Sequence, residues 1–403
     1  MRSSEVRATG QLAGGAAGGM AVFIQDAHAT VASRPFGLLG PLAAPVRIVH
    51  DRISATTYRA VARALAAGPI AIARLTPGNG IPLADTLRGS MALGALNGAI
   101  GDRLARDGNP LALEMRLRAD EERVPTPRLA VFVHGLCETD EAWRMFSREP
   151  YGARLYKDLG YSPVYVRYNT GLRISDNGRR LAESLEEAVA DWPVPVEEIA
   201  LVGHSMGGLV ARSACHYGAA TEAGWAKRVR HVFCLGAPHL GAPLEKAANA
   251  AGYALARLPE TRPLARIVNG RSVGIKDLRF GSCVEEDWCD CDPDEFMRDR
   301  CTEVPFLECA TYYFVGATLS RRPDGPGALV GDLLVQYPSA SGNGRRRRIP
   351  FEVDKGMHLG GATHFQLLNH PAVYEQLVSW LRAGSGSGAL DSPTPLQPLL
   401  PSG

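Results

Sequence analysis

The sequence lacks an excess of charge of either sign. Its 403 residues include 44 Lys and Arg against 42 Asp and Glu, which leaves a formal net charge of +2. A chain so nearly balanced gives no general electrostatic reason to expect nucleic acid or an anionic membrane as its partner. We therefore expect no nucleic-acid partner, and the balance is compatible with an enzyme.

Long hydrophobic runs are also missing. No segment approaches the ~20 consecutive apolar residues that cross a bilayer, so we expect no integral membrane segment. Near the N-terminus, residues 8–25 carry five glycines where an export signal would have a dense leucine core. A cytoplasmic location is therefore expected, with export through a cleavage site at Ala27-His28-Ala29 as the alternative.

The cysteines do not follow a zinc-binding pattern. A structural zinc site usually shows two C-x-x-C pairs, whereas here a C-x-C at Cys289 and Cys291 stands among single cysteines. The run Asp290-x-Asp292-x-Asp294 lacks the glycine and the terminal glutamate of an EF-hand loop. We assign no metal site, and disulfides, a metal ion or free thiols all remain open for five cysteines: Cys283, Cys289, Cys291, Cys301 and Cys309.

What the sequence does contain is enough apolar material for a large core, since 45% of its residues are hydrophobic. Apolar residues recur at helical spacing over 21–32, 56–67 and 91–106, which predicts a helical N-terminal region over residues 1–125. Its helices are expected to shield the sheet. The last segment, 384–403, is rich in Gly, Ser and Pro and is predicted to be a disordered tail.

Between these ends, residues 126–383 alternate short apolar strands with helical stretches. This alternation is typical of an α/β fold with a mostly parallel sheet flanked by helices. Helices are predicted near 153–159, 178–191, 206–217 and 371–382. Strands are predicted near residues 129–133, 164–168, 199–202, 232–235, 311–315 and 349–353.

The most informative motif is Gly203-His204-Ser205-Met206-Gly207. The apolar run 199–202 precedes it and helical spacing follows it, so the motif predicts a strand, a tight turn and a helix with Ser205 at the apex. The two glycines suit this turn because a Cβ there would collide with the neighbouring strand or helix. A serine on such a turn presents its hydroxyl as a nucleophile, whereas the bare G-x-S-x-G pattern also occurs by chance.

A serine nucleophile needs a base, and in the hydrolase arrangement the base lies between the last strand and the last helix. His364 fits that position, because it follows Gly360-Gly361 and precedes the helix predicted from residue 371. His358 and His370 are the alternatives, each of which could equally be a solvated loop histidine.

The base needs a carboxylate to orient it, and this acid should follow the strand before the histidine. Asp332, in Gly331-Asp332-Leu333, is the predicted acid. Asp324 is the alternative, although its Pro-Asp-Gly-Pro setting is typical of a simple turn. Asp332 could also be no more than a helix cap.

Two backbone N–H groups should stabilise the oxyanion. The segment Val133-His134-Gly135-Leu136 ends the first clear strand, so we predict an oxyanion hole formed by the N–H groups of Leu136 and Met206. His134 is expected to orient the loop, and His204 to pack beside the serine turn.

Four segments together resemble the α/β-hydrolase superfamily, specifically its bacterial lipase and esterase-like members, and also the related inositol-deacylase-like branch. They are residues 133–136, 203–208, 235–243 and 369–374. The family usually shows Asp-Gly-x-Val at the acid, whereas Asp332 is followed by Leu333-Leu334-Val335.

The resemblance implies hydrolysis of carboxylic esters without a cofactor, on a small-molecule or lipid ester. Ser205 would attack the carbonyl, His364 would shuttle the proton, Asp332 would stabilise the imidazolium, and water would then deacylate the serine. An acyltransferase with the same three residues, or a non-catalytic binding protein that keeps the fold, is the alternative. Residues 240–308 are long enough to form a cap or lid over the site, or only an elaborated loop.

Overall fold

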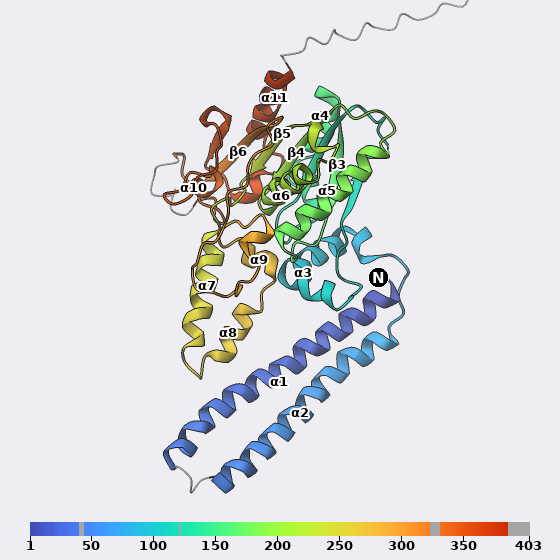
Figure 1. Ribbon diagram of the computed structural model, residues 1–403. Coiled ribbons are helices and arrows are strands. Elements are labelled where there is room, and N and C mark those ends of the chain that lie inside the picture. The colour runs from blue at the N-terminus through green and yellow to red at the C-terminus, as the bar shows by residue number, and fades with distance from the viewer. Residues whose placement is uncertain (40–43, 121, 323–330, 386–403) are drawn as a thin grey trace, which may run out of the picture.

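A seven-stranded sheet forms the centre of the molecule (Figure 1). The computed structural model describes residues 1–39, 44–120, 122–322 and 331–385, so nearly all of the predicted tail lies outside the described residues. The strand order is β1-β3-β2-β4-β5-β6-β7, and every neighbouring pair is parallel except β1 with β3. The strands are β1 (Arg116–Ala119), β2 (Arg128–Val133), β3 (Tyr161–Arg167), β4 (Glu198–His204), β5 (Val229–Leu235), β6 (Thr311–Thr318) and β7 (Gly356–Gly360).

Helices cover both faces of this sheet, which explains why its central strands are apolar throughout. In β2, Leu129, Val131 and Val133 pack on one face with α5 and α6, while Ala130 and Phe132 pack on the other with α4 and α11. The predicted α/β class is therefore confirmed. The four helices are α4 (Tyr151–Leu159), α5 (Ile174–Ala190), α6 (Met206–Ala220) and α11 (Pro371–Ser385).

The last predicted strand is misplaced. Residues 349–353 alternate apolar and polar side chains, but Pro350 has no N–H to donate to a ladder, and Ile349 N donates instead to Gly342 O within a local turn. The strand β7 forms a few residues later and pairs with β6, with His358 opposite Gly316. The short strand β1, whose residues are Arg-Leu-Arg-Ala, was not predicted.

The N-terminal region is helical, as predicted. Helices α1 (Ser3–Leu39) and α2 (Ala44–Leu75) form a long antiparallel hairpin that projects from the body, and α3 (Leu87–Arg106) packs against the body itself (Figure 1). Gly10, Gly14 and Gly18 of α1 face α2, where a Cβ on Gly14 would come within 2.7 Å of the carbonyl oxygen of Ala66. Small residues therefore let the two backbones approach closely. No helix in the described ranges is long and apolar enough to cross a membrane.

The segment between β5 and β6 contains three helices beside the carboxyl ends of the strands. They are α7 (Pro243–Ala256), α8 (Arg262–Asn269) and α9 (Val273–Asp277). Helices α7 and α8 extend from the body on the same side as the hairpin (Figure 1), and the Arg266 guanidinium of α8 pairs with Asp26 of α1. The predicted cap segment thus includes these helices and contacts the hairpin.

Candidate active site

Ser205 lies on the turn between β4 and α6 in a strained backbone conformation. Its φ of 54° and ψ of −124° are rare for a residue with a side chain. The Ser205 N–H donates to Leu235 O at 2.8 Å, which fixes the turn to β5. The strand, sharp turn and helix predicted from the motif are therefore present, and the serine side chain borders a cavity.

The glycines that flank Ser205 are required by close packing. A Cβ on Gly203 would lie 2.5 Å from the backbone nitrogen of Gly208, and one on Gly207 would lie 2.1 Å from the carbonyl oxygen of Val133. Neither contact could relax, because the opposing atoms belong to the backbone. The turn can therefore approach both its own helix and the end of β2.

His364 and Asp332 are hydrogen-bonded to each other in the protein interior. The distance from His364 Nδ1 to Asp332 Oδ2 is 2.7 Å, and the His364 backbone N–H donates to Asp332 O at 3.0 Å. The other carboxylate oxygen, Asp332 Oδ1, accepts from the N–H groups of Leu334 and Val335 at 3.0 and 2.8 Å. The carboxylate is thus held in place, and it orients the imidazole.

The second nitrogen of that imidazole has no protein partner. His364 Nε2 is buried and makes no hydrogen bond among the described residues. His364 and Ser205 border the same cavity. An unpartnered, oriented nitrogen at the edge of a cavity is the arrangement expected of a general base awaiting substrate.

The alternative residues have other surroundings. His358 lies on β7, where its Nε2 is 2.7 Å from Thr318 Oγ1 and its ring contacts Tyr337 edge-on. His370 accepts a hydrogen bond from Tyr151 through its backbone carbonyl and precedes α11. Neither is among the residues that line the cavity of Ser205. Asp324 lies outside the described residues.

The loop after β2 lies against the serine. A Cβ on Gly135 would be 2.9 Å from Ser205 Cβ, and Leu136 lines the cavity beside it. Met206 is the first residue of α6, so its N–H is one of the helix-terminal donors without an intrahelical acceptor. His134 is fully buried, stacks on Tyr168 and donates from Nδ1 to Gly135 O at 3.0 Å.

A carboxylate not considered in the sequence analysis lies beside this loop. Glu138 Oε2 accepts from Gly135 N at 2.7 Å and lies 3.2 Å from His204 Nδ1, while His204 Nε2 donates to His364 O at 3.3 Å. Both nitrogens of His204 therefore face acceptors only, which favours its charged form. Glu138 thus links the loop after β2 to the serine turn and to the His364 backbone.

The pKa values agree with this ion pair. Burial lowers the pKa of His204, but the charge and hydrogen bond of Glu138 outweigh burial and raise it above 6.5. Burial likewise raises the pKa of Glu138, yet the adjacent His204 holds it below its usual value. Both shifts favour the ionised pair, and Glu138 lines the cavity.

Helix α3 supports the same loop from behind. Gly94 and Gly98 face Cys137, and a Cβ on Gly98 would lie 3.0 Å from the Cys137 backbone nitrogen. Ser90 Oγ on α3 is 2.9 Å from Thr139 Oγ1. The expectation that the N-terminal helices only shield the sheet is therefore too narrow for α3, because this helix fixes the loop next to Ser205.

The cavity at Ser205 has a volume of about 290 Å³ and a mainly apolar lining. Helix α7 and its start supply Ala242, Leu244 and Ala248, and the region of α9 supplies Ile275 and Leu278. This size is near the lower end of the range for ligand pockets, roughly 300–1,000 Å³. The predicted cap segment therefore forms one wall of the cavity.

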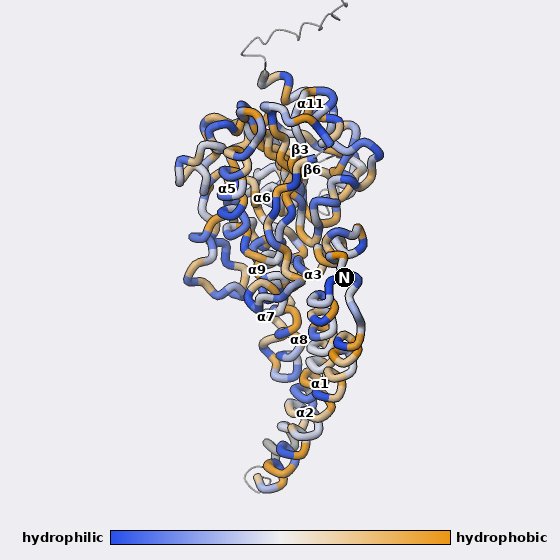
Figure 2. The backbone as a smooth tube through the Cα atoms, turned by 90° about the vertical axis from the view of Figure 1, so that its right-hand side faces the viewer, coloured by the Kyte–Doolittle hydropathy of each residue, from blue (hydrophilic) through white to orange (hydrophobic). Residues whose placement is uncertain are grey.

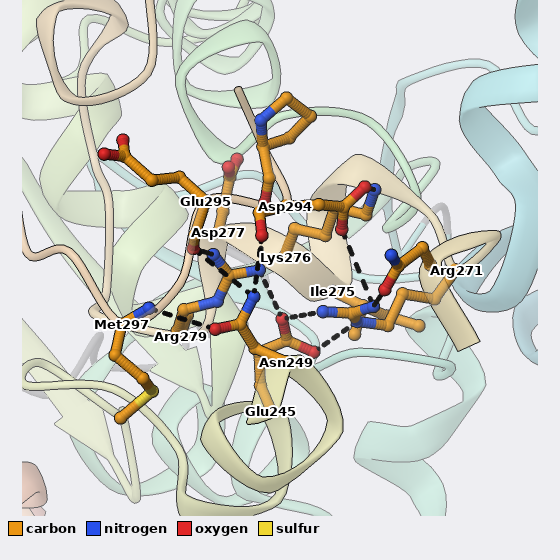
Figure 3. A network of polar contacts seen from close by, with 12 residues as sticks. Glu245, Asn249, Arg271, Ile275, Lys276, Asp277, Arg279, Asp294, Glu295 and Met297 are labelled. Carbon is orange, nitrogen blue, oxygen red and sulfur yellow. Dashed lines mark hydrogen bonds and ion pairs between the residues drawn. The ribbon is translucent and has the colours of Figure 1, made fainter. Parts of the chain in front are cut away.

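A buried ionic network holds that wall in place (Figure 3). The carboxylate of Glu245 on α7 accepts two hydrogen bonds from Arg271, of 2.6 and 2.7 Å, and a third from Arg279, of 3.1 Å. Asn249, one turn further along α7, accepts from Met297 N at 3.1 Å. Charge-assisted bonds of this kind are strong when both partners are buried, so α7 is fixed against the segments on both sides of α9.

The cysteines of the cap segment do not contribute to the cavity. All eight cysteines of the chain lie within the described residues, and all are free thiols. In the described part of the chain, no three His, Cys, Asp or Glu side chains are grouped so that they could hold a metal ion. Burial raises the pKa of Cys283 and of Cys301, the latter to about 12, so these thiols stay protonated.

Comparison with known proteins places this geometry in context. Residues 126–289 match the family described as a PGAP1-like alpha/beta domain. The mature lipase BlEst2 of Bacillus licheniformis is 22% identical, with 66% of this chain and 98% of that chain covered and a TM-score of 0.44. A lipase-esterase related protein from Clostridium acetobutylicum is 15% identical, with 66% and 99% covered and a TM-score of 0.35.

The type II thioesterase YbtT of the yersiniabactin pathway is 14% identical, with 67% of this chain and 98% of that chain covered and a TM-score of 0.36. No curated protein sequence matches this chain. Similarity at these levels concerns overall architecture and does not assign a substrate.

Proposed function

We propose that this chain hydrolyses carboxylic esters through Ser205, His364 and Asp332. Its sheet, its serine turn and the family match of residues 126–289 identify it as an α/β-hydrolase. The observation that carries the proposal is the buried bond of 2.7 Å between Asp332 and His364, with His364 Nε2 left unpartnered beside the cavity of Ser205. This set of groups serves acyl transfer through a serine.

In the proposed reaction, Ser205 Oγ attacks the ester carbonyl while His364 Nε2 takes the hydroxyl proton. The resulting tetrahedral oxyanion is stabilised by the N–H groups of Leu136 and Met206. The imidazolium, stabilised by Asp332, then returns the proton to the leaving alcohol, and an acyl-serine remains. Water, deprotonated by His364, attacks the acyl group and releases the acid and Ser205.

Glu138 is proposed as a positioning residue for this reaction. It binds the N–H of Gly135, the residue before the proposed donor Leu136, and it is paired with His204 next to the serine. Its carboxylate therefore fixes the oxyanion loop relative to the nucleophile. The interaction is made before substrate arrives, so it preorganises the site.

The cavity supports a preference for an apolar acyl group. At about 30 Å³ per water-sized group, 290 Å³ holds on the order of ten heavy atoms. The acidic and arginine residues that line the cavity, Glu138, Glu245 and Arg271, are already paired within the chain, so the apolar residues of α7 and α9 are left to contact such an acyl chain. We therefore expect acyl chains of intermediate length to be preferred.

A series of p-nitrophenyl esters from acetate to palmitate tests the proposal. We expect kcat/KM to rise with acyl length to an optimum near eight to ten carbons, with no turnover by Ser205→Ala. Folded wild-type protein that cleaves none of the esters would contradict hydrolysis and favour a binding protein. Product analysis with an added alcohol distinguishes hydrolysis from acyl transfer to that alcohol.

A further inference from the structure

Helix α2 carries an exposed apolar face along its whole length. Seven large aliphatic side chains, each between 43% and 84% exposed, recur at intervals that place them on one side of the helix at 3.6 residues per turn. We call this face the α2 stripe. It consists of Val46, Val49, Ile53, Val61, Leu65, Ile72 and Leu75.

The stripe is not the face that contacts the rest of the chain. Helix α2 packs on α1 through Ala62, Ala66 and Ala73 and the side chain of Ile70. In Figure 2 the hairpin extends well away from the body, with hydrophobic residues recurring out to its far end. An exposed apolar surface of this extent marks an interaction site.

A row of arginines lies along one flank of the stripe. Helix α2 contains five arginines and a single acidic residue, Asp51. Four of these arginines lie on one side of the helix, between the stripe and the contact with α1, because their spacings are 7, 4 and 11 residues. They are Arg52, Arg59, Arg63 and Arg74. We call these four residues the arginine row, and all four are exposed.

Most of these cations have no acidic partner among the described residues. Asp51 pairs with Arg47 at 3.6 Å and with His50. In the part of the chain that the structure describes, no carboxylate lies within ion-pair distance of Arg52, Arg59 or Arg63. A second copy of the hairpin would bring a row of the same sign, so the charge pattern disfavours self-association as the explanation of the stripe.

We propose that the α1–α2 hairpin docks on an anionic lipid surface through the α2 stripe and the arginine row. An apolar helix face flanked by arginines suits a bilayer surface, because the aliphatic side chains enter the acyl boundary while the guanidinium groups reach the phosphates. Helix α1 has no charged residue from 8 to 25. The net charge of +2 conceals this local excess.

Helix α1 of the hairpin also contacts the cap segment. Asp26 of α1 pairs with Arg266 of α8, and α8 itself exposes Leu264 and Ile267. Helix α7, which forms one wall of the cavity, is adjacent to α8. The docking proposal itself does not depend on ester hydrolysis.

Vesicle flotation with the full-length Ser205→Ala protein tests docking without lipid turnover. The vesicles are phosphatidylcholine alone or phosphatidylcholine with one third phosphatidylglycerol. We expect binding to the anionic vesicles only, falling as salt is added. The variant R52Q/R59Q/R63Q should bind roughly 100-fold more weakly, since each arginine near an anionic surface contributes about a factor of five.

Two further variants make the result specific. Val49→Ser with Ile53→Ser should lose binding while the arginine row is intact, and R345Q/R346Q/R348Q, which removes three exposed arginines elsewhere, should bind as the parent does. Circular dichroism checks that each variant is folded. Three results would each overturn the proposal. They are absence of vesicle binding by the parent protein, an equal loss of binding in the control variant, and a dimer in sedimentation equilibrium that only the stripe variant dissociates.

Discussion

At the carboxyl edge of the sheet the polar side chains are buried and bonded to one another, whereas along the α1–α2 hairpin the charged side chains are exposed and the apolar ones face outward. Asp332, His364, His204 and Glu138 form a connected set of hydrogen bonds next to the turn of Ser205. Within the hairpin, small residues let α1 and α2 pack closely against each other. The polar side chains at the sheet edge are held in place by partners within the chain, whereas the partner that we propose for the hairpin lies outside the chain.

This difference implies that the two regions can be disabled separately. Changes at the sheet edge should remove chemistry and leave docking intact, and changes on the hairpin should do the reverse. The largest expected effect is that of Ser205→Ala, which removes the nucleophile and should lower kcat roughly 10⁴- to 10⁶-fold. Steady-state hydrolysis of a soluble p-nitrophenyl ester measures this effect. Equal vesicle binding by the variant is the matching control, and residual turnover near wild type would mean another nucleophile.

Removal of the base should be nearly as damaging. His364→Ala is expected to lower kcat roughly 10⁴-fold or more, because Ser205 would lose its proton acceptor. His358→Ala is the matched control. This histidine bonds Thr318 on the neighbouring strand, so we expect less than about a threefold change, as is usual for a residue that does not touch the reacting atoms. The opposite ranking would move the base to His358.

Glu138→Gln should have an intermediate effect. The amide can still accept from the N–H of Gly135, but it loses the ion pair with His204, so the oxyanion loop is held less firmly. We expect kcat to fall roughly 10- to 100-fold with KM nearly unchanged, a smaller loss than removal of an oxyanion donor itself. An unchanged kcat would show that Glu138 does not position the loop.

The same variant predicts how stability depends on pH. The pKa of His204 is raised in the folded state, so its ion pair stabilises the fold below the unfolded pKa near 6.5 and the contribution is lost as pH rises through the raised value. The lowered pKa of Glu138 keeps the carboxylate charged throughout this range. The difference in Tm between wild type and Glu138→Gln should therefore be largest near pH 6 and shrink toward pH 9. A difference that grows with pH would contradict the pair.

The smallest expected effects concern the hairpin glycines. Gly15 has open space around its Cβ position, so Gly15→Ala should stabilise α1 by about 0.5–1 kcal/mol. At Gly14, one residue earlier, an added Cβ would lie 2.7 Å from the Ala66 carbonyl oxygen, so Gly14→Ala should destabilise the hairpin by about 1–3 kcal/mol through overpacking. Urea unfolding followed by circular dichroism compares the two. Equal effects would show that the hairpin is not packed on this face.

The sequence was a good guide where function depends on local geometry. The sharp turn at Ser205 was predicted because the residues of a strand, two glycines and a helix follow one another in one continuous segment. The positions of His364 and Asp332 followed from chain order relative to the strands, and the structure brings these two side chains within hydrogen-bond distance. The roles of all three in catalysis stay predictions.

Where contacts join distant segments, the sequence was a poorer guide. Glu138 gave little local signal, because its importance comes from His204, 66 residues later. The strand predicted at 349–353 was wrong, because the alternation of apolar and polar side chains favours a strand whereas Pro350 cannot donate to its ladder. Strand β7 was missed because it begins and ends at glycines, which do not favour strands. The net charge of +2 likewise averaged out the arginine row, which is recognisable only once helix α2 is divided into faces.

The most direct test of the central claim is covalent labelling with a fluorophosphonate, followed by mapping of the modified peptide by mass spectrometry. The account predicts one adduct, on Ser205, which forms rapidly in wild type, slowly in His364→Ala and not at all in Ser205→Ala. Folded wild-type protein that stays unmodified, or that carries the label on another residue, would contradict it.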